Sequence, residues 1–153
     1  PRVLAIFAAL WSLHTSKGLG SGHYLQPHAL QILAIFIMLG MHEDEEKLRK
    51  CLIEIKTGQG KSLVLGLLAA VLAYMGISVD ILCYWEYLAN RDKDDFKWLH
   101  EEHFKGQINY LVIESMKSKY GTQLVNHQDH SEATVSQIIE QFALNKIEKS
   151  YEI

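Results

Sequence analysis

Apolar residues fall into separate runs along the chain, and their spacing predicts alternating helices and strands. Runs at helical spacing predict helices over residues 3–13, 28–41, 61–75, 86–104 and 131–149. Short apolar runs predict strands over residues 51–53, 78–84 and 107–113. Strand and helix alternation of this kind predicts an α/β fold with a parallel sheet flanked by helices.

The helical runs differ in how much apolar surface they carry. The run 3–13 is apolar nearly all round, so we expect this helix to be buried. The segment 86–104 is strongly charged and fits one or two amphipathic helices on the surface. Pro27 suits the first helical turn of the segment after it, and Gly76 and Gly106 suit the ends of the segments before them. The strand 78–84 is nearly all apolar, as in a sheet covered on both faces.

The length of 153 residues favours a single lobe over 1–153. Within it we expect an N-terminal helix and turn over 1–23, a core over 24–114, and a tail with a terminal helix over 115–153. The chain begins with Pro1 rather than Met, which favours a fragment of a longer protein.

Composition narrows the class of protein. Hydrophobic residues make up 48% of the chain and charged residues 22%, and the net charge is −3. An acidic balance provides no basic footprint for nucleic acid, so a nucleic-acid partner is disfavoured. The apolar runs are all shorter than the roughly 20 residues that span a bilayer. Cys51 and Cys83 fall on predicted buried strands, which favours reduced thiols and a cytoplasmic location.

The stretch 54–62, E-I-K-T-G-Q-G-K-S, stands between a predicted strand and a predicted helix, where a phosphate-binding loop belongs. Gly58 and Gly60 let the backbone turn tightly and direct its N–H groups inward. Lys61 is placed to reach the β- and γ-phosphates of a nucleotide, and the Ser62 hydroxyl to hold Mg²⁺. The long form of this motif has glycine where Ile55 stands, whereas the shorter T-G-x-G-K-[ST] form of helicase-like motors is intact.

Three stretches in the right order resemble the first nucleotide-binding domain of the SecA preprotein-translocase ATPases. The loop 54–62 is similar to that family's E-M-K-T-G-E-G-K-T, and E-Y-L-A-N-R-D at 86–92 is similar to its D-Y-L-A-R-R-D. Upstream, Q-P-H-A-L-Q at 26–31 resembles the family's short motif with an adenine-reading glutamine. The divergent SecA-like proteins of eukaryotes are the most similar branch, since they carry L-Q-P-H and G-T-G-E-G-K-S.

The resemblance implies a P-loop NTPase with a RecA-like sheet, here a partial, DEAD-like motor lobe that binds ATP and Mg²⁺. Gln31 would bind the adenine edge, and residues Thr57, Gly58, Gln59, Gly60, Lys61 and Ser62 would wrap the phosphates. Arg91 would couple the loop to neighbouring parts rather than touch the nucleotide. In the parent protein the resemblance also implies a second motor lobe and a polypeptide substrate that is translocated.

Hydrolysis is less well supported than binding. The family continues to an acidic Walker B stretch, and the nearest candidate here is Glu114, which an ordinary polar strand end also explains. Tyr120-Gly121-Thr122 resembles the segment that precedes that stretch, which would place the acidic pair outside this chain. Three interpretations therefore stay open: a motor ATPase lobe with Lys61 and Glu114 in catalytic roles, a degenerate non-hydrolysing module for binding or interaction, and a helicase-like lobe acting on nucleic acid.

Two further groupings have ordinary explanations. The histidine pairs His100/His103 and His127/His130 have a spacing compatible with zinc, but no cysteine pair accompanies them, and surface histidines are the simpler interpretation. The aromatic residues around the second predicted strand, Tyr84, Trp85, Tyr87 and Trp98, fit core packing at the sheet's edge better than stacking on a ligand.

Overall fold

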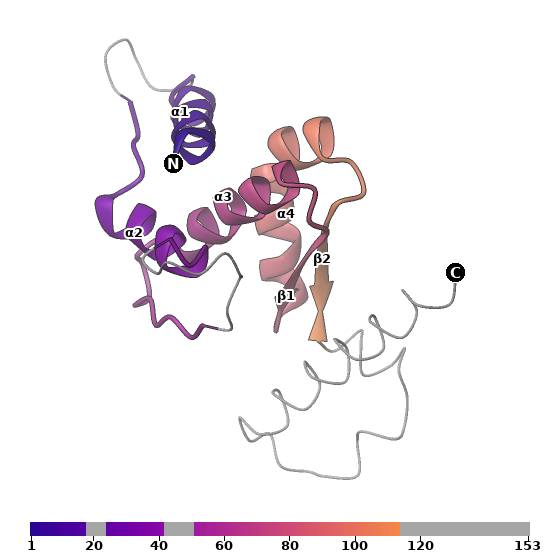
Figure 1. Ribbon diagram of the computed structural model, residues 1–153. Helices are drawn as coiled ribbons and strands as arrows, with labels where there is room; N and C mark the ends of the chain where they lie inside the picture. The colour runs from indigo at the N-terminus through magenta and orange to yellow at the C-terminus, as the bar shows by residue number, and fades with distance from the viewer. Residues whose placement is uncertain (18–23, 42–50, 114–153) are drawn as a thin grey trace, which may run out of the picture. The chain divides into compact units, whose positions relative to one another are not determined.

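A computed structural model of the chain describes residues 1–17, 24–41 and 51–113. These contain α1 (Arg2–Ser16), α2 (Ala29–Met38), α3 (Lys61–Tyr74), β1 (Val79–Cys83), α4 (Glu86–His103) and β2 (Ile108–Val112) (Figure 1). By its internal contacts the chain divides into Pro1–Leu111 and Val112–Ile153, and the first unit holds nearly all of these elements. The predicted helix over 131–149, the histidine pair at 127 and 130, and Glu114 lie outside the described residues.

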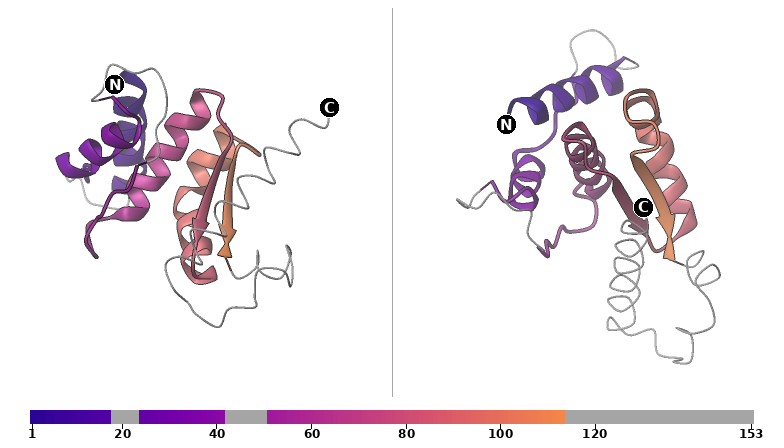
Figure 2. Two further views of the ribbon diagram at one scale, coloured as in Figure 1. Left: turned by 60° about the horizontal axis from the view of Figure 1, so that its bottom comes forward. Right: turned by 45° about the vertical axis from the view of Figure 1, so that its right-hand side comes forward.

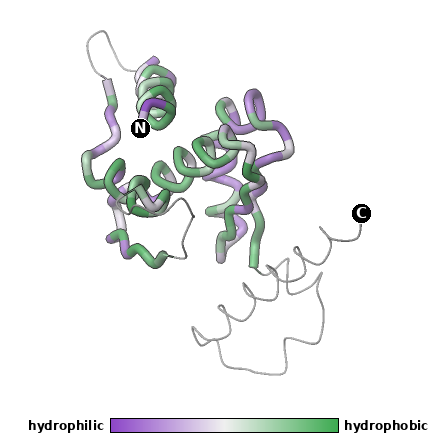
Figure 3. Tube along the Cα trace, in the orientation of Figure 1, coloured by the Kyte–Doolittle hydropathy of each residue, from purple (hydrophilic) through white to green (hydrophobic). Residues whose placement is uncertain are grey.

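Helix α3 is the element on which the others pack. It contacts α1, α2, α4 and β1, and Figure 3 shows it hydrophobic along its length. Its buried residues are Leu63, Val64, Gly66, Leu67, Ala69, Ala70, Val71 and Ala73. The helix ends as predicted at Gly76, whose φ of 83° follows from a Schellman turn in which the Ile77 N–H bonds the Leu72 carbonyl at 3.0 Å.

The two strands lie side by side and run in the same direction, as Figures 1 and 2 show. The Val79 N–H donates to the Gln107 carbonyl at 2.7 Å, and the Asn109 amide donates to Asp80 at 2.9 Å. The described residues therefore form a mixed α/β fold with a small parallel sheet. Of the five residues in β1 only Ile81 is buried, so the expectation of a strand fully covered on both faces is wrong for these residues.

The strand expected over 51–53 does not form. Residues 51–56 belong to no helix or strand, and Leu52 is 98% exposed. Ile53 and Ile55 pack against the core of the helices, while Glu54 between them is exposed. The alternating pattern is thus satisfied by contact with helices, and Cys51 is exposed rather than buried on a strand.

The first two helices also differ from their predictions in detail. In α1 only one face is buried, through Leu4 and Phe7, and Ile6 is 58% exposed, because α3 is the one described element with which α1 shares an extensive contact. The prediction of a fully buried helix is therefore wrong. Helix α2 begins after the N-cap His28, so Pro27 precedes the helix instead of lying in its first turn. Among residues 1–17, 24–41 and 51–113, no helix has the length and apolar character that would let it cross a membrane.

Helices α3 and α4 meet closely at a glycine. A Cβ on Gly66 would lie 2.5 Å from the ring of Phe96, so only glycine permits this approach. One turn further along α4, the His100 ring lies 3.0 Å from the Gly66 carbonyl through Nε2. His100 is 4% exposed, so its assignment to the surface is wrong. Burial lowers its pKa from the ordinary 6.5, and the bond to Gly66 opposes that shift.

The aromatic residues after β1 do not form the expected core cluster. Tyr84 and Trp85 make an edge-to-face pair with ring centroids 5.0 Å apart, but they are 39% and 57% exposed. Tyr87 is 75% exposed. Trp98 instead lies further along α4, where it stacks on His14 of α1 with centroids 4.1 Å apart. The prediction is therefore wrong for the three aromatic residues around the start of α4, whereas Trp98 packs partly against the core of the helices.

Candidate functional site

The loop before α3 has the backbone geometry that phosphate binding needs. Gly58 and Gly60 both have left-handed conformations, with φ of 83° and 72°. Gly60 is the N-cap of α3, and its carbonyl accepts from Leu63 at 3.1 Å and Val64 at 3.3 Å. The helix therefore directs its N-terminal N–H groups and the positive end of its dipole toward the exposed loop. Thr57 stands just before Gly58 and is exposed as well.

Lys61 lies at the start of α3 with its ammonium group on the loop. Its Nζ donates to the Ile55 carbonyl at 3.1 Å, in an exposed position. The bond holds the side chain back along the segment that leads into the loop. An exposed bond of this kind is exchanged readily for a stronger acceptor such as a phosphate oxygen.

Gln31 joins α2 to the loop, although its partner Gln59 lies 28 residues further along the chain. Its Oε1 accepts from the His28 N–H at 2.8 Å, and its Nε2 donates to the Gln59 carbonyl at 2.8 Å. The residue is 8% exposed. A Cβ on Gly60 would collide with the same Nε2, so the glycine also makes room for the amide.

An open pocket of about 820 Å³ lies beside Gln31. Helix α2 and the extended segment before the loop line it with His28, Ala29, Leu30, Gln31, Leu33, Ala34, Ile37, Ile53, Glu54, Ile55, Lys56 and Gln59. Its surface is mainly apolar, with an amide at one edge. The Gln31 amide retains one hydrogen and one lone pair beyond its two bonds, which is the complement that the edge of a planar base requires.

Ser62 contacts a charged pair from α4. Its hydroxyl donates to Oδ1 of Asp92 at 2.9 Å, and Nη2 of Arg91 donates to the hydroxyl oxygen at 3.0 Å. Arg91 also donates to that carboxylate oxygen, through Nε at 2.9 Å and Nη2 at 2.6 Å. Arg91 thus couples the loop to α4, as expected, and it does so through the residue predicted to hold Mg²⁺.

The charge of Asp92 influences its neighbours. The hydrogen bond and charge of Asp92 raise the pKa of Arg91, so the guanidinium stays protonated. Burial raises the pKa of the Cys83 thiol, and Asp92 adds to that shift. Cys83 is therefore held as a neutral thiol rather than as a nucleophilic thiolate.

Among the described residues no cluster of three or more His, Cys, Asp or Glu side chains is suited to hold a metal ion. A divalent cation at the loop would find the Ser62 hydroxyl and the Asp92 carboxylate, and would need phosphate oxygens and water for its other ligands. The Arg91 guanidinium already lies within hydrogen-bond distance of both of these oxygen ligands.

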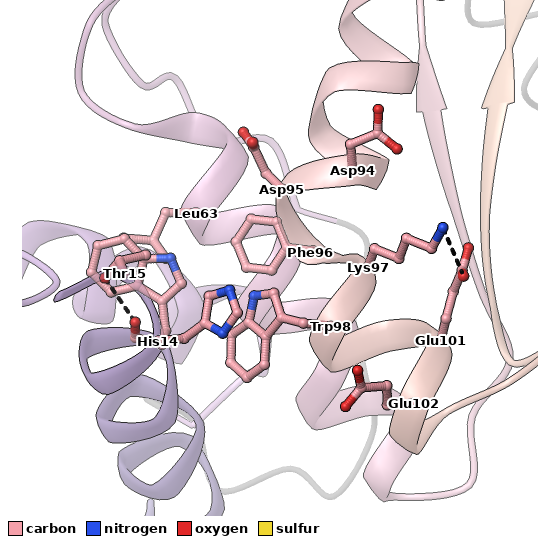
Figure 4. Close-up of a pocket in the computed structure, with 11 residues that line it drawn as sticks. His14, Thr15, Leu63, Asp94, Asp95, Phe96, Lys97, Trp98, Glu101 and Glu102 are labelled. Carbon is pink, nitrogen blue, oxygen red and sulfur yellow. Dashed lines mark hydrogen bonds and ion pairs between the residues drawn. The ribbon is translucent and has the colours of Figure 1, made fainter. Parts of the chain in front are cut away.

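A second pocket of about 790 Å³ lies between α1 and α4 (Figure 4). Figure 4 shows His14 of α1 next to Trp98 of α4, the two rings being stacked, with acidic side chains further along α4. The carboxylates that line it are Asp94, Asp95, Glu101 and Glu102. Lys97 pairs with Glu101 at 3.8 Å. An acidic rim of this kind repels phosphate, so the pocket is not a second nucleotide site.

A family model described as the SecA DEAD-like domain matches residues 4–143, which is most of the chain. The chain belongs to the SecA DEAD-like domain family. No curated protein and no solved structure gives a significant match. The matched range includes Gln31, the phosphate loop and the segment 86–92, so the resemblance to SecA-like motor lobes is confirmed at the level of the family.

The structure of this SecA DEAD-like domain brings most of the predicted site residues together. Gln31 bonds Gln59 and lies against Gly60, and Lys61 and Ser62 follow Gly60 directly in the chain. The roles assigned to them stay predictions. Asp92 was missed, although a signal exists: it stands at the core spacing of α4, between Ala89 and Phe96. A carboxylate at a buried helical position normally has a partner.

Proposed function

We propose that this chain is the ATP-binding lobe of a SecA-like motor ATPase of the RecA-like P-loop fold, closest to the divergent SecA-like proteins of eukaryotes. The geometry of the loop carries the proposal. Two left-handed glycines precede a helix whose N-terminus presents N–H groups, Lys61 and Ser62 on one exposed surface. The family match over 4–143 supports the same assignment.

In the proposed binding mode, each part of the nucleotide contacts a different group of residues. The N–H groups of Thr57–Ser62 and the Lys61 ammonium would bind the phosphates. Gln31 would bind the adenine edge, with the base in the apolar pocket beside it. The residues fit the group: a Cβ on Gly60 would fill the space that keeps Gln31 on the loop, and the pocket has room for a base. Mg²⁺ would neutralise phosphate charge next to Ser62 only where Arg91 gives up its bond to the hydroxyl.

In the parent protein, ATP binding and hydrolysis would move this lobe against a second lobe and so move a polypeptide. Coupling requires contacts that sense the loop, and the Ser62–Arg91 bond joins the loop to α4. A nucleotide that displaces this bond changes the restraint on α4. Lys61 would act in catalysis by neutralising charge on the transferred phosphate. Glu114 is the candidate for the acidic residue of the Walker B stretch.

A second function, a non-hydrolysing nucleotide-binding or interaction module, is favoured by one observation. The Ser62 hydroxyl is already held by Asp92 and Arg91, and an arginine beside this group opposes a metal ion. A helicase-like lobe is the weaker alternative because neither the net charge of −3 nor the family match favours it. Salt-dependent binding to RNA or DNA would favour that alternative.

A turnover assay on the full chain separates the motor lobe from the non-hydrolysing module. Phosphate release from ATP is measured for the wild type, for Glu114→Gln, and for the matched control Glu101→Gln on the exposed face of α4. Turnover above background that only Glu114→Gln abolishes supports a hydrolysing lobe. Nucleotide binding without turnover supports the module, and the absence of both contradicts the proposed function.

A further inference from the structure

The contact between Ser62, Arg91 and Asp92 couples the loop to α4 and also orients the Ser62 hydroxyl. A serine hydroxyl has one hydrogen and two lone pairs. Here the hydrogen is donated to Asp92, and one lone pair accepts from the Arg91 guanidinium at 3.0 Å. The hydroxyl is thus oriented by its carboxylate partner with its oxygen toward a cation, which is the orientation that a bound Mg²⁺ requires.

The Arg91 guanidinium is held beside Ser62 by contacts within the fold. Asp92 is 8% exposed, and a single oxygen of its carboxylate accepts from both Nε and Nη2 of Arg91. The Arg91 side chain is 46% exposed, whereas the side chain of Asp92 is 12% exposed. Two bonds to one buried acceptor fix the guanidinium more firmly than a surface ion pair.

Arg91 and a magnesium ion would compete for the same ligands. Mg²⁺ takes oxygen ligands at about 2.0–2.1 Å and requires near-octahedral space around them. A guanidinium within hydrogen-bond distance of both Ser62 and Asp92 fills that space, and its permanent charge repels a divalent cation. The same charge faces the loop where the proposed phosphates bind, so it can offset their charge in place of the metal.

We propose that Arg91 is a built-in cation that substitutes for Mg²⁺ beside Ser62, so that this lobe binds nucleotide almost independently of magnesium. The inference rests on the proposed function, since it concerns a nucleotide at this loop. Asp92 is the positioning residue, since one of its oxygens accepts from both the Arg91 guanidinium and the Ser62 hydroxyl. Removing Arg91 exposes the two oxygen ligands and makes binding depend on the metal.

The test is a titration of the full chain with a fluorescent nucleoside diphosphate, in excess Mg²⁺ and in EDTA. We expect the wild-type affinity to differ by less than about threefold between the two buffers. Arg91→Gln should show a loss of about tenfold or more in EDTA, the size expected when one charge beside a phosphate must be replaced by a metal. Lys93→Gln, which removes a positive charge from the exposed side of the same helix, should retain the wild-type ratio.

The outcomes separate the two proposals. Saturable wild-type binding that itself weakens tenfold in EDTA overturns the role of Arg91, and this measurement needs no variant. An equal ratio of affinities for Arg91→Gln and the wild type overturns it too. If the wild type binds no nucleotide in either buffer, the proposed function fails, and the inference fails with it.

Discussion

Gly60 and Gly66 create the same kind of contact at two points along α3, with different consequences. At each glycine a side chain from another helix occupies the place where a Cβ would lie: the Gln31 amide at Gly60 and the Phe96 ring at Gly66. The Gln31 amide is the end of a flexible polar chain beside an open pocket, whereas the ring is 3% exposed in the core. The first contact positions a candidate ligand group, and the second sets the distance between two helices.

The largest effect on stability should come from Gly66→Ala. The added methyl group overlaps the Phe96 ring, which has no room to move, and overpacking of this kind costs about 1–3 kcal/mol. Denaturant unfolding measures the loss, and a second substitution of Phe96→Leu should recover part of it. A stabilised Gly66→Ala variant, as helix propensity alone would give, would contradict the close contact.

Gly60→Ala should destabilise less and impair binding more. A left-handed alanine costs roughly 1–2 kcal/mol, and the Gln31 amide can swing away from the new methyl group. Because Gln31 then leaves its position, affinity for adenine nucleotides should fall by about tenfold, the value of one hydrogen bond to the base. The control is Gly76→Ala, which has a φ of 83° and no atom near its Cβ, and should alter only stability. Equal affinities for Gly60→Ala and the wild type would show that the position of Gln31 does not matter for nucleotide binding.

The smallest effect concerns His100 at the Gly66 contact. Burial lowers its pKa in the folded chain, so the unfolded chain takes up the proton first as the pH falls. Stability should therefore decrease as the pH drops through 6.5 and stop decreasing below the folded-state pKa. His100→Gln keeps a donor for the Gly66 carbonyl but does not titrate. Its unfolding free energy should change less than that of the wild type between about pH 7.5 and about pH 5.5, and parallel pH profiles would show that His100 is not the group responsible.

The sequence predicted the ends of α3 and α4 better than it predicted which elements are buried or paired. Gly76 and Gly106 marked helix ends correctly because a left-handed residue is a local requirement. Two predictions were wrong: that α1 is buried and that residues 51–53 form a strand. Burial and strand pairing depend on which neighbouring elements are present. The apolar spacing of Ile53 and Ile55 is equally compatible with packing against helices.

The candidate site shows the same division between local and long-range information. The loop glycines, Lys61 and Ser62 were visible as a contiguous pattern. Gln31 was identified only through a resemblance, because nothing in the spacing of residues indicates that α2 meets the loop. Asp92 was overlooked since its partner Ser62 is distant in sequence, and only the fold shows that a carboxylate on α4 accepts the hydroxyl hydrogen.

The central claim is that the loop binds ATP, and calorimetric titration of ATP with excess Mg²⁺ into the wild type and Lys61→Ala tests it most directly. The Lys61 ammonium donates to the Ile55 carbonyl in an exposed position, so we expect the variant to fold. Lys105→Ala serves as the matched exposed control. We expect saturable binding by the wild type and Lys105→Ala and a loss of about tenfold to hundredfold for Lys61→Ala, the value of a hydrogen bond to a charged group. Equal affinity of Lys61→Ala and the wild type would contradict the claim.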